Sequence, residues 1–102
     1  MQKVYLITFN QPLPLDFFDY SKFHGFLLSY PRITDWWHYL KTTYIVVTDS
    51  LVTASDLTNF LIPQYKNLQF LVIEVNLQNH NGLLHPDAWK WINARLSHKY
   101  NF

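Results

Sequence analysis

The fold is decided by residues 36–48, which read WWHYLKTTYIVVT. Aromatic and β-branched residues lie on both sides of a short polar break at residues 41–42, a pattern typical of two antiparallel strands joined by a tight turn. An uninterrupted register from that turn places alternate residues on opposite faces of the hairpin. One face is then expected to carry Trp37, Tyr39, Tyr44 and Val46, and the other Trp36, His38, Leu40, Ile45 and Val47.

Both faces of this predicted hairpin are apolar. An antiparallel hairpin with water on one side alternates apolar with polar residues, and this one does not. We therefore expect another element to pack on each face of the sheet. The C-terminal helix and a second copy of the chain are the two candidates for the second face.

The composition of the chain favours self-association. Its 102 residues are expected to form a single domain over residues 1–102. The hydrophobic fraction is 49% and the aromatic fraction 19%, which is more ring surface than one small core is expected to bury. Large residues left outside a core form patches, and such patches mark interfaces. The sequence thus predicts a homodimer or a complex with another protein.

Charge and cysteine content exclude several classes of protein. The formal net charge of +1 lacks the strongly basic character of a dedicated phosphate binder. The absence of cysteine excludes disulfides, thiol nucleophiles and thiolate metal sites, and fits a reducing compartment. No stretch approaches the roughly 20 apolar residues of a membrane span. We expect a soluble, cytoplasmic protein that does not act at a membrane.

The remaining elements follow from hydrophobic periodicity and from helix-end signals. Two further strands are predicted at residues 4–9 and 68–75, both apolar on two faces. Gly25 lies inside the first predicted helix, where an interior glycine indicates the close approach of another element. The three helices are predicted between Asp19 and Pro31, between Thr53 and Pro63, and from Pro86 onward. Their buried stripes are expected to be Phe23, Phe26, Leu27 and Tyr30; Leu57, Phe60 and Leu61; and Ala88, Trp91, Ile92 and Leu96.

This order of elements predicts an α+β fold. Two strand–helix–strand units joined by a hairpin give a ferredoxin-like βαββαβ arrangement, in which a four-stranded antiparallel sheet has two helices on one face. The C-terminal helix is an addition to that arrangement. The open face of the sheet then needs a cover.

Several of these segments carry a resemblance to a group of known proteins. The chain resembles short bacterial and phage proteins labelled SinR-like, which are similar in architecture to the small ferredoxin-like nuclease subunit of CRISPR adaptation complexes. The resemblance implies a shape and a mobile-element or defence context rather than a particular reaction. The segments that carry it are WWHYL at 36–40, TYIV at 43–46, LVIEV at 71–75, Gly82, and PDAWKWI at 86–92.

The resemblance also bears on metal binding. The CRISPR-type nucleases place an aspartate just after their first strand, where this chain has Asn10. An amide oxygen supplies no negative charge to hold a hard cation, and Asp16 and Asp19 lie farther along the chain. His80 and His85 match none of the usual zinc spacings. The sequence therefore predicts no metal, no cofactor and no catalytic residues.

The candidate binding residues are the ring-bearing side chains of the hairpin. We take Trp37, Tyr39, Tyr44 and His38 as these candidates, since aromatic rings supply interface area or stack on bases. The favoured hypothesis is a non-catalytic, homodimeric module that binds itself or another protein. The alternatives are a metal-dependent nuclease like the CRISPR-adaptation subunit and a single-stranded nucleic-acid-binding protein.

Overall fold

The part of the chain that the structure describes folds into seven regular elements. The computed structural model describes residues 2–10 and 18–95. Asp16 and Leu96, both named in the sequence analysis, lie outside these described residues. The elements are β1 (Gln2–Phe9), α1 (Tyr20–Leu28), β2 (Ile33–Leu40), β3 (Thr43–Asp49), α2 (Ala54–Leu61), β4 (Phe70–Glu74) and α3 (Pro86–Ala94).

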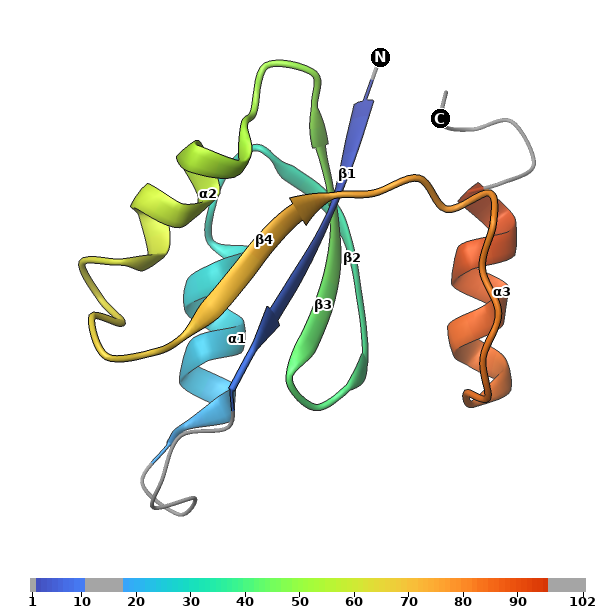
Figure 1. Ribbon diagram of the computed structural model, residues 1–102, viewed down its shortest axis with the longest axis horizontal. Coiled ribbons are helices and arrows are strands. Elements are labelled where there is room, and N and C mark those ends of the chain that lie inside the picture. The colour runs from blue at the N-terminus through green and yellow to red at the C-terminus, as the bar shows by residue number, and fades with distance from the viewer. Residues whose placement is uncertain (1, 11–17, 96–102) are drawn as a thin grey trace.

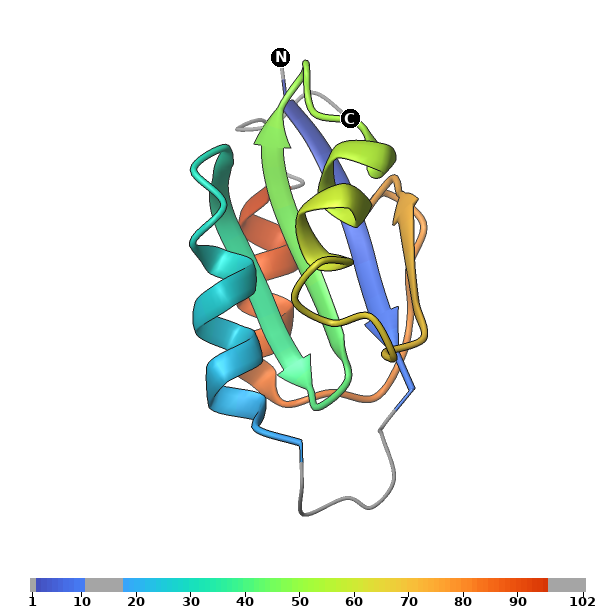
Figure 2. The same cartoon turned by 90° about the vertical axis from the view of Figure 1, so that its left-hand side faces the viewer.

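The four strands form one antiparallel sheet with the order β2-β3-β1-β4. The predicted α+β class and the predicted four-stranded antiparallel sheet are confirmed. Helices α1 and α2 lie on one face and α3 lies on the other, so the molecule has three layers (Figures 1 and 2). Because α3 adds a seventh element after β4, the βαββαβα order differs from the plain ferredoxin-like arrangement.

Each helix begins at a side chain that satisfies a backbone N–H of the first turn. The Asp19 carboxylate accepts a hydrogen bond from the Lys22 N–H at the start of α1. Thr53 and Asp56 form a reciprocal capping box at the start of α2, where the sequence predicts a helix. His85 caps α3 with Pro86 in the first helical turn.

The first core lies between the sheet and helices α1 and α2. The predicted stripes of both helices face it, with Phe23 and Leu27 buried on α1 and Leu57 and Leu61 buried on α2. Rings dominate this layer, and the stacked pair Phe26–Phe60, 4.6 Å between centroids, joins the two helices. The strand residues of this core are Tyr5, Ile7, Phe9, Tyr44 and Val46.

The second core lies between the sheet and α3. Trp37 is only 3% exposed there, and its indole N–H donates to the Ala88 carbonyl oxygen at 3.2 Å. Arg95, just after α3, pairs with Asp35 of β2 and covers the Trp91 ring. The other buried members of this core are Val4, Ile45, Val47, Leu77 and Ile92.

The predicted hairpin exists, but its predicted register is wrong. The turn lies at residues 41–42, and Leu40 pairs with Thr43 as expected. Between Trp37 and Leu40 the register shifts, so that Trp37 pairs with Ile45 instead of Val46. A one-residue slip transfers side chains to the opposite face. The structure therefore groups Trp37 with Ile45 and Val47, while Tyr44 and Val46 face the other helices.

The second face of the sheet is only half covered. Helix α3 contacts β2 and packs over Val47 and Ile45 of β3. It therefore covers the half of this face that β2 and β3 form, and β4 lies at the opposite edge of the sheet. On β4, Leu71 is 55% exposed and Ile73 is 48% exposed. The expected shielding of the second face is thus supplied by α3 for one half, and no helix among residues 2–10 and 18–95 covers the other half. In the described part of the chain, none of the helices has the length and apolarity needed to cross a membrane.

Candidate functional site

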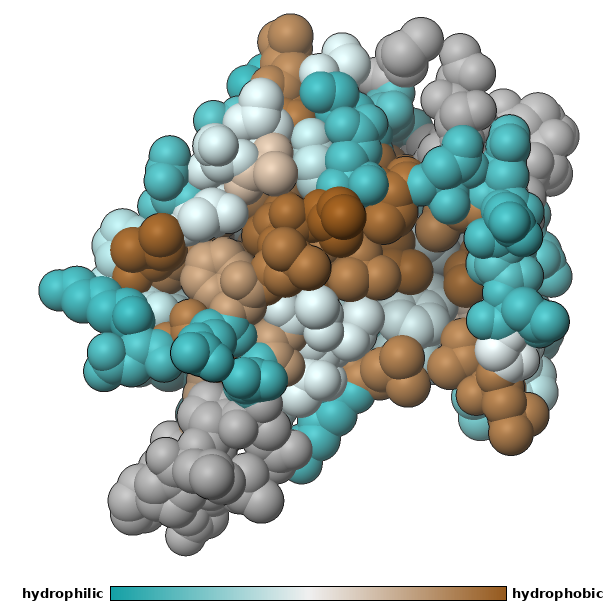
Figure 3. Space-filling model, in the orientation of Figure 1, coloured by the Kyte–Doolittle hydropathy of each residue, from teal (hydrophilic) through white to brown (hydrophobic). Residues whose placement is uncertain are grey.

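Exposed apolar residues gather on the half of the second sheet face that α3 does not cover. Its apolar members are Leu6 of β1 and Leu71 and Ile73 of β4, which we call the open apolar face. Leu6 and Ile73 are cross-strand partners, and Leu71 pairs with Thr8 on the same face. Figure 3 shows apolar surface gathered over β4, beside the polar outer surface of α3. A contiguous apolar patch of this kind is typical of an interaction site.

The strands under this face pair regularly. β1 and β4 pair without a register shift from Tyr5–Glu74 to Phe9–Phe70. Alternation along β4 directs Phe70 and Val72 into the first core and leaves Leu71 and Ile73 outward. The open apolar face is therefore held by a regular two-stranded ladder.

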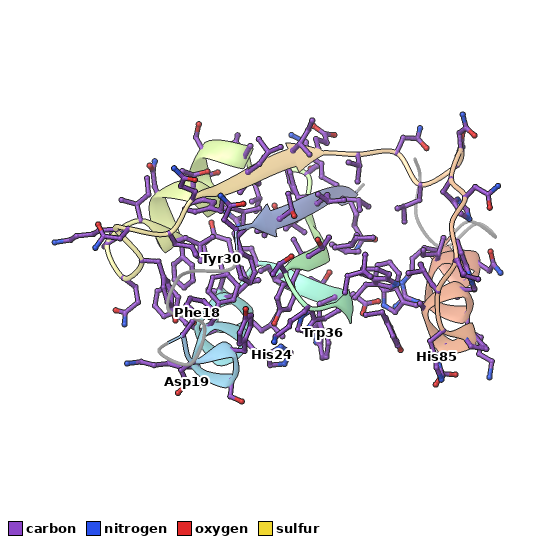
Figure 4. The ribbon with its side chains drawn as sticks, turned by 60° about the horizontal axis from the view of Figure 1, so that its bottom comes forward. Phe18, Asp19, His24, Tyr30, Trp36 and His85 are labelled. Carbon is purple, nitrogen blue, oxygen red and sulfur yellow. The ribbon has the colours of Figure 1, made fainter. Side chains whose placement is uncertain are left out.

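A second group of side chains gathers where α1 meets β2. It consists of His24, Trp36, His38 and Tyr44, which we call the histidine cluster. A hydrogen bond of 2.8 Å joins His24 Nδ1 and the Tyr44 hydroxyl. The His38 ring stacks on the Tyr44 ring with centroids 3.9 Å apart, and the His24 ring meets the Trp36 ring edge-on at 4.9 Å. Figure 4 shows His24 beside Trp36, with His85 far away at α3.

Burial shifts the pKa values of Tyr44 and His24 in this cluster. It raises the pKa of Tyr44 to about 12 because the phenolate would lose its hydration. Burial also lowers the pKa of His24, and the nearby His38 lowers it further. At neutral pH a protonated Tyr44 and an uncharged His24 share their hydrogen bond. Because this hydrogen bond joins α1 to β3, it ties the helix to the sheet.

The four predicted binding residues do not form one site. Trp37 is buried under α3, and the half-exposed Tyr39 ring lies 5.5 Å from it on that side. His38 and the buried Tyr44 belong to the α1 side of the sheet. Trp37, Tyr39 and Tyr44, which are expected on one face of the hairpin, are thus divided between the two faces.

The residues considered for metal binding have structural partners. The Asn10 side-chain amide donates to Gln69 Oε1 at 2.8 Å, and Asp19 caps α1. His80 stacks on Trp89, and His85 caps α3. Among residues 2–10 and 18–95, no three His, Cys, Asp or Glu side chains come together as a metal site would require. Asp16 lies outside the described residues.

Sequence reasoning missed His24. The residue flanks the predicted apolar stripe of α1, four positions after Tyr20 and three before Leu27, so it faces the same side of the helix. That spacing is the available signal. The spacing alone does not show which rings His24 contacts, because the β2–β3 register decides which hairpin rings face α1.

Comparison of the chain with protein-family models, curated proteins and solved structures found no match.

Proposed function

We propose that this chain is a homodimeric interaction module with no chemistry of its own. The observation that supports it best is the open apolar face, where Leu71 and Ile73 stay about half exposed next to a half-sheet that α3 covers. The formal net charge of +1 presents little repulsion between two copies. We further propose a ferredoxin-like framework extended by α3, and a mobile-element or defence context; the resemblance to SinR-like proteins supports both.

The free energy gained by burying the open apolar face is too small to hold a dimer together on its own. Complete burial of a large aliphatic side chain contributes about 1.5–3 kcal/mol. Leu71 and Ile73 are half exposed, so four such side chains from two copies would contribute about 3–6 kcal/mol. Association itself costs about 4–15 kcal/mol. A stable dimer therefore needs further contacts beside the open apolar face.

Sedimentation velocity over a concentration series tests the proposal. The native chain is expected to shift from monomer to dimer as its concentration rises. The double variant Leu71→Lys with Ile73→Lys is expected to stay monomeric, because four ammonium groups would have to be buried at the contact.

The matched control places the same charges elsewhere. Leu51 and Ile62 are also exposed apolar residues, 70% and 46%, but neither lies on the sheet. The double variant Leu51→Lys with Ile62→Lys is expected to dimerise like the native chain. A native chain that stays monomeric at every concentration, or equal association of both double variants, would contradict the proposal.

A further inference from the structure

The two edges of the sheet differ in how they are protected. β2 forms one edge, and its pairing with β3 is interrupted between Ile33 and Asp35 and again between Trp37 and Leu40. Irregularities of this kind discourage the addition of another strand. β4 forms the other edge, pairs with β1 without any shift, and contains neither proline nor lysine in its sequence FLVIE. β4 therefore has the features of an unprotected edge strand.

The hydrogen bonds at the ends of β4 show which backbone groups point outward. The Asn10 N–H donates to the Gln69 carbonyl oxygen at 3.0 Å, and the Val75 N–H donates to the Val4 carbonyl oxygen at 2.9 Å. Gln69 and Val75 thus face β1, and along a strand this direction alternates from residue to residue. Between these two residues, Phe70, Val72 and Glu74 therefore direct their N–H and C=O groups away from β1.

We propose that β4 pairs antiparallel with β4 of a second copy, about a two-fold axis at Val72. This inference rests on the proposed homodimer and specifies its contact. The outward N–H groups of each copy donate to the outward carbonyl oxygens of the other, and one continuous sheet runs through both chains. Leu71 of each copy then lies directly opposite Ile73 of the other, so the exposed residues of the two open apolar faces become cross-strand pairs.

Charge and side-chain pairing select this register. An axis at Glu74 would place the two Glu74 carboxylates opposite each other, which is destabilising. An axis at Phe70 would place Leu71 opposite Gln69 and Ile73 opposite Asn67, pairing apolar with polar residues. With the axis at Val72, the two Glu74 residues are about 13 Å apart along the strands. Of the axes at the three outward-facing residues Phe70, Val72 and Glu74, the one at Val72 both separates the carboxylates and pairs the exposed apolar side chains.

Disulfide formation between single-cysteine variants tests the register, because the native chain contains no cysteine. Leu71 and Ile73 of the second copy would form a non-hydrogen-bonded pair with Cα atoms about 4.5 Å apart, which suits a disulfide. Two Leu71 residues, or two Ile73 residues, would lie about 7–8 Å apart on the diagonal. A mixture of Leu71→Cys and Ile73→Cys chains is expected to cross-link at least about tenfold faster than either variant alone. Equal rates would overturn the register, as would equally fast cross-linking of the exposed control Leu51→Cys.

A proline variant tests strand pairing without cysteine. Val72→Pro removes an N–H that points away from β1, so the ladder with β1 keeps its donors. Val72→Ala makes a comparable loss of packing but keeps the N–H. By sedimentation, the alanine variant is expected to dimerise and the folded proline variant to remain monomeric; dimerisation of both would overturn the pairing. If the native chain dimerises but either test gives the contrary result, the β4 pairing is wrong and the proposed function is unaffected. A native chain that stays monomeric contradicts the proposed function itself.

Discussion

His24 and Tyr44 show how burial controls single residues in this fold. The Tyr44 hydroxyl is held in its protonated form by a pKa raised to about 12, and its partner His24 is held uncharged by a lowered pKa. Protonation of His24 in acid therefore works against the burial of its ring. It also changes the donor and acceptor roles in the 2.8 Å hydrogen bond between His24 Nδ1 and the Tyr44 hydroxyl. The stability of the packing between α1 and β3 is consequently expected to depend on pH.

The first prediction concerns the acid sensitivity of His24. Its pKa is lower in the folded chain than the ordinary value near 6.5, so at mildly acidic pH the unfolded chain binds more protons. The free energy of unfolding is therefore expected to fall as the pH drops below about 6.5, and to level off below the folded pKa. His24→Gln should reduce this dependence. Urea unfolding of both proteins at about pH 7.5 and about pH 5.5 measures it, and an equal loss of stability in both would contradict the assignment.

At the scale of elements, the helices were the easiest features to predict and the second strand was the hardest. Asp19, Thr53 and Pro86 mark their helix starts through local chemistry, which a sequence displays directly. The irregular pairing of β2 depends on tertiary contacts. Asp35 accepts hydrogen bonds from Trp91 and Arg95, and Trp37 is held under α3, so residues at the far end of the chain influence the register of the hairpin.

That irregularity also explains the limits of site prediction. Periodicity located Trp37, Tyr39, Tyr44 and His38 in the hairpin correctly, but a uniform alternation assigned Trp37 and Tyr44 to the same face. Because the shift lies between Trp37 and Leu40, the predicted grouping of Trp37 with Tyr44 is wrong, whereas Trp37 and Tyr39 do lie together as predicted. The apolar nature of both faces was predictable, and the open apolar face is its consequence.

The second prediction concerns Gly25 in α1. An interior glycine suggested the close approach of another element, and that expectation is wrong, because a Cβ atom at Gly25 would meet nothing within 4 Å. Gly25→Ala is therefore expected to raise the free energy of unfolding by about 0.5–1 kcal/mol, through helix propensity and reduced freedom of the unfolded chain. Thermal or urea unfolding measures the change. A destabilised Gly25→Ala variant would show that another group does occupy this side of the helix.

At the scale of the whole molecule, one sheet carries two apolar faces with unequal covers. Helices α1 and α2 close the first face, and α3 closes only the part of the second that lies over β2 and β3 (Figure 2). Leu71 and Ile73 remain outside on β4, which is also the regular edge of the sheet. The same strand thus presents unpaired backbone groups and unburied side chains, and one contact with a second copy would satisfy both.

Small-angle X-ray scattering of the native chain tests most directly whether a second copy covers the open apolar face. The forward scattering is expected to correspond to twice the chain mass of 12.3 kDa. The radius of gyration is expected to be clearly larger than the 13.8 Å of the single chain, because copies joined edge to edge lengthen the particle. A mass of 12.3 kDa with a radius of gyration close to 13.8 Å, at every concentration up to the solubility limit, would contradict it.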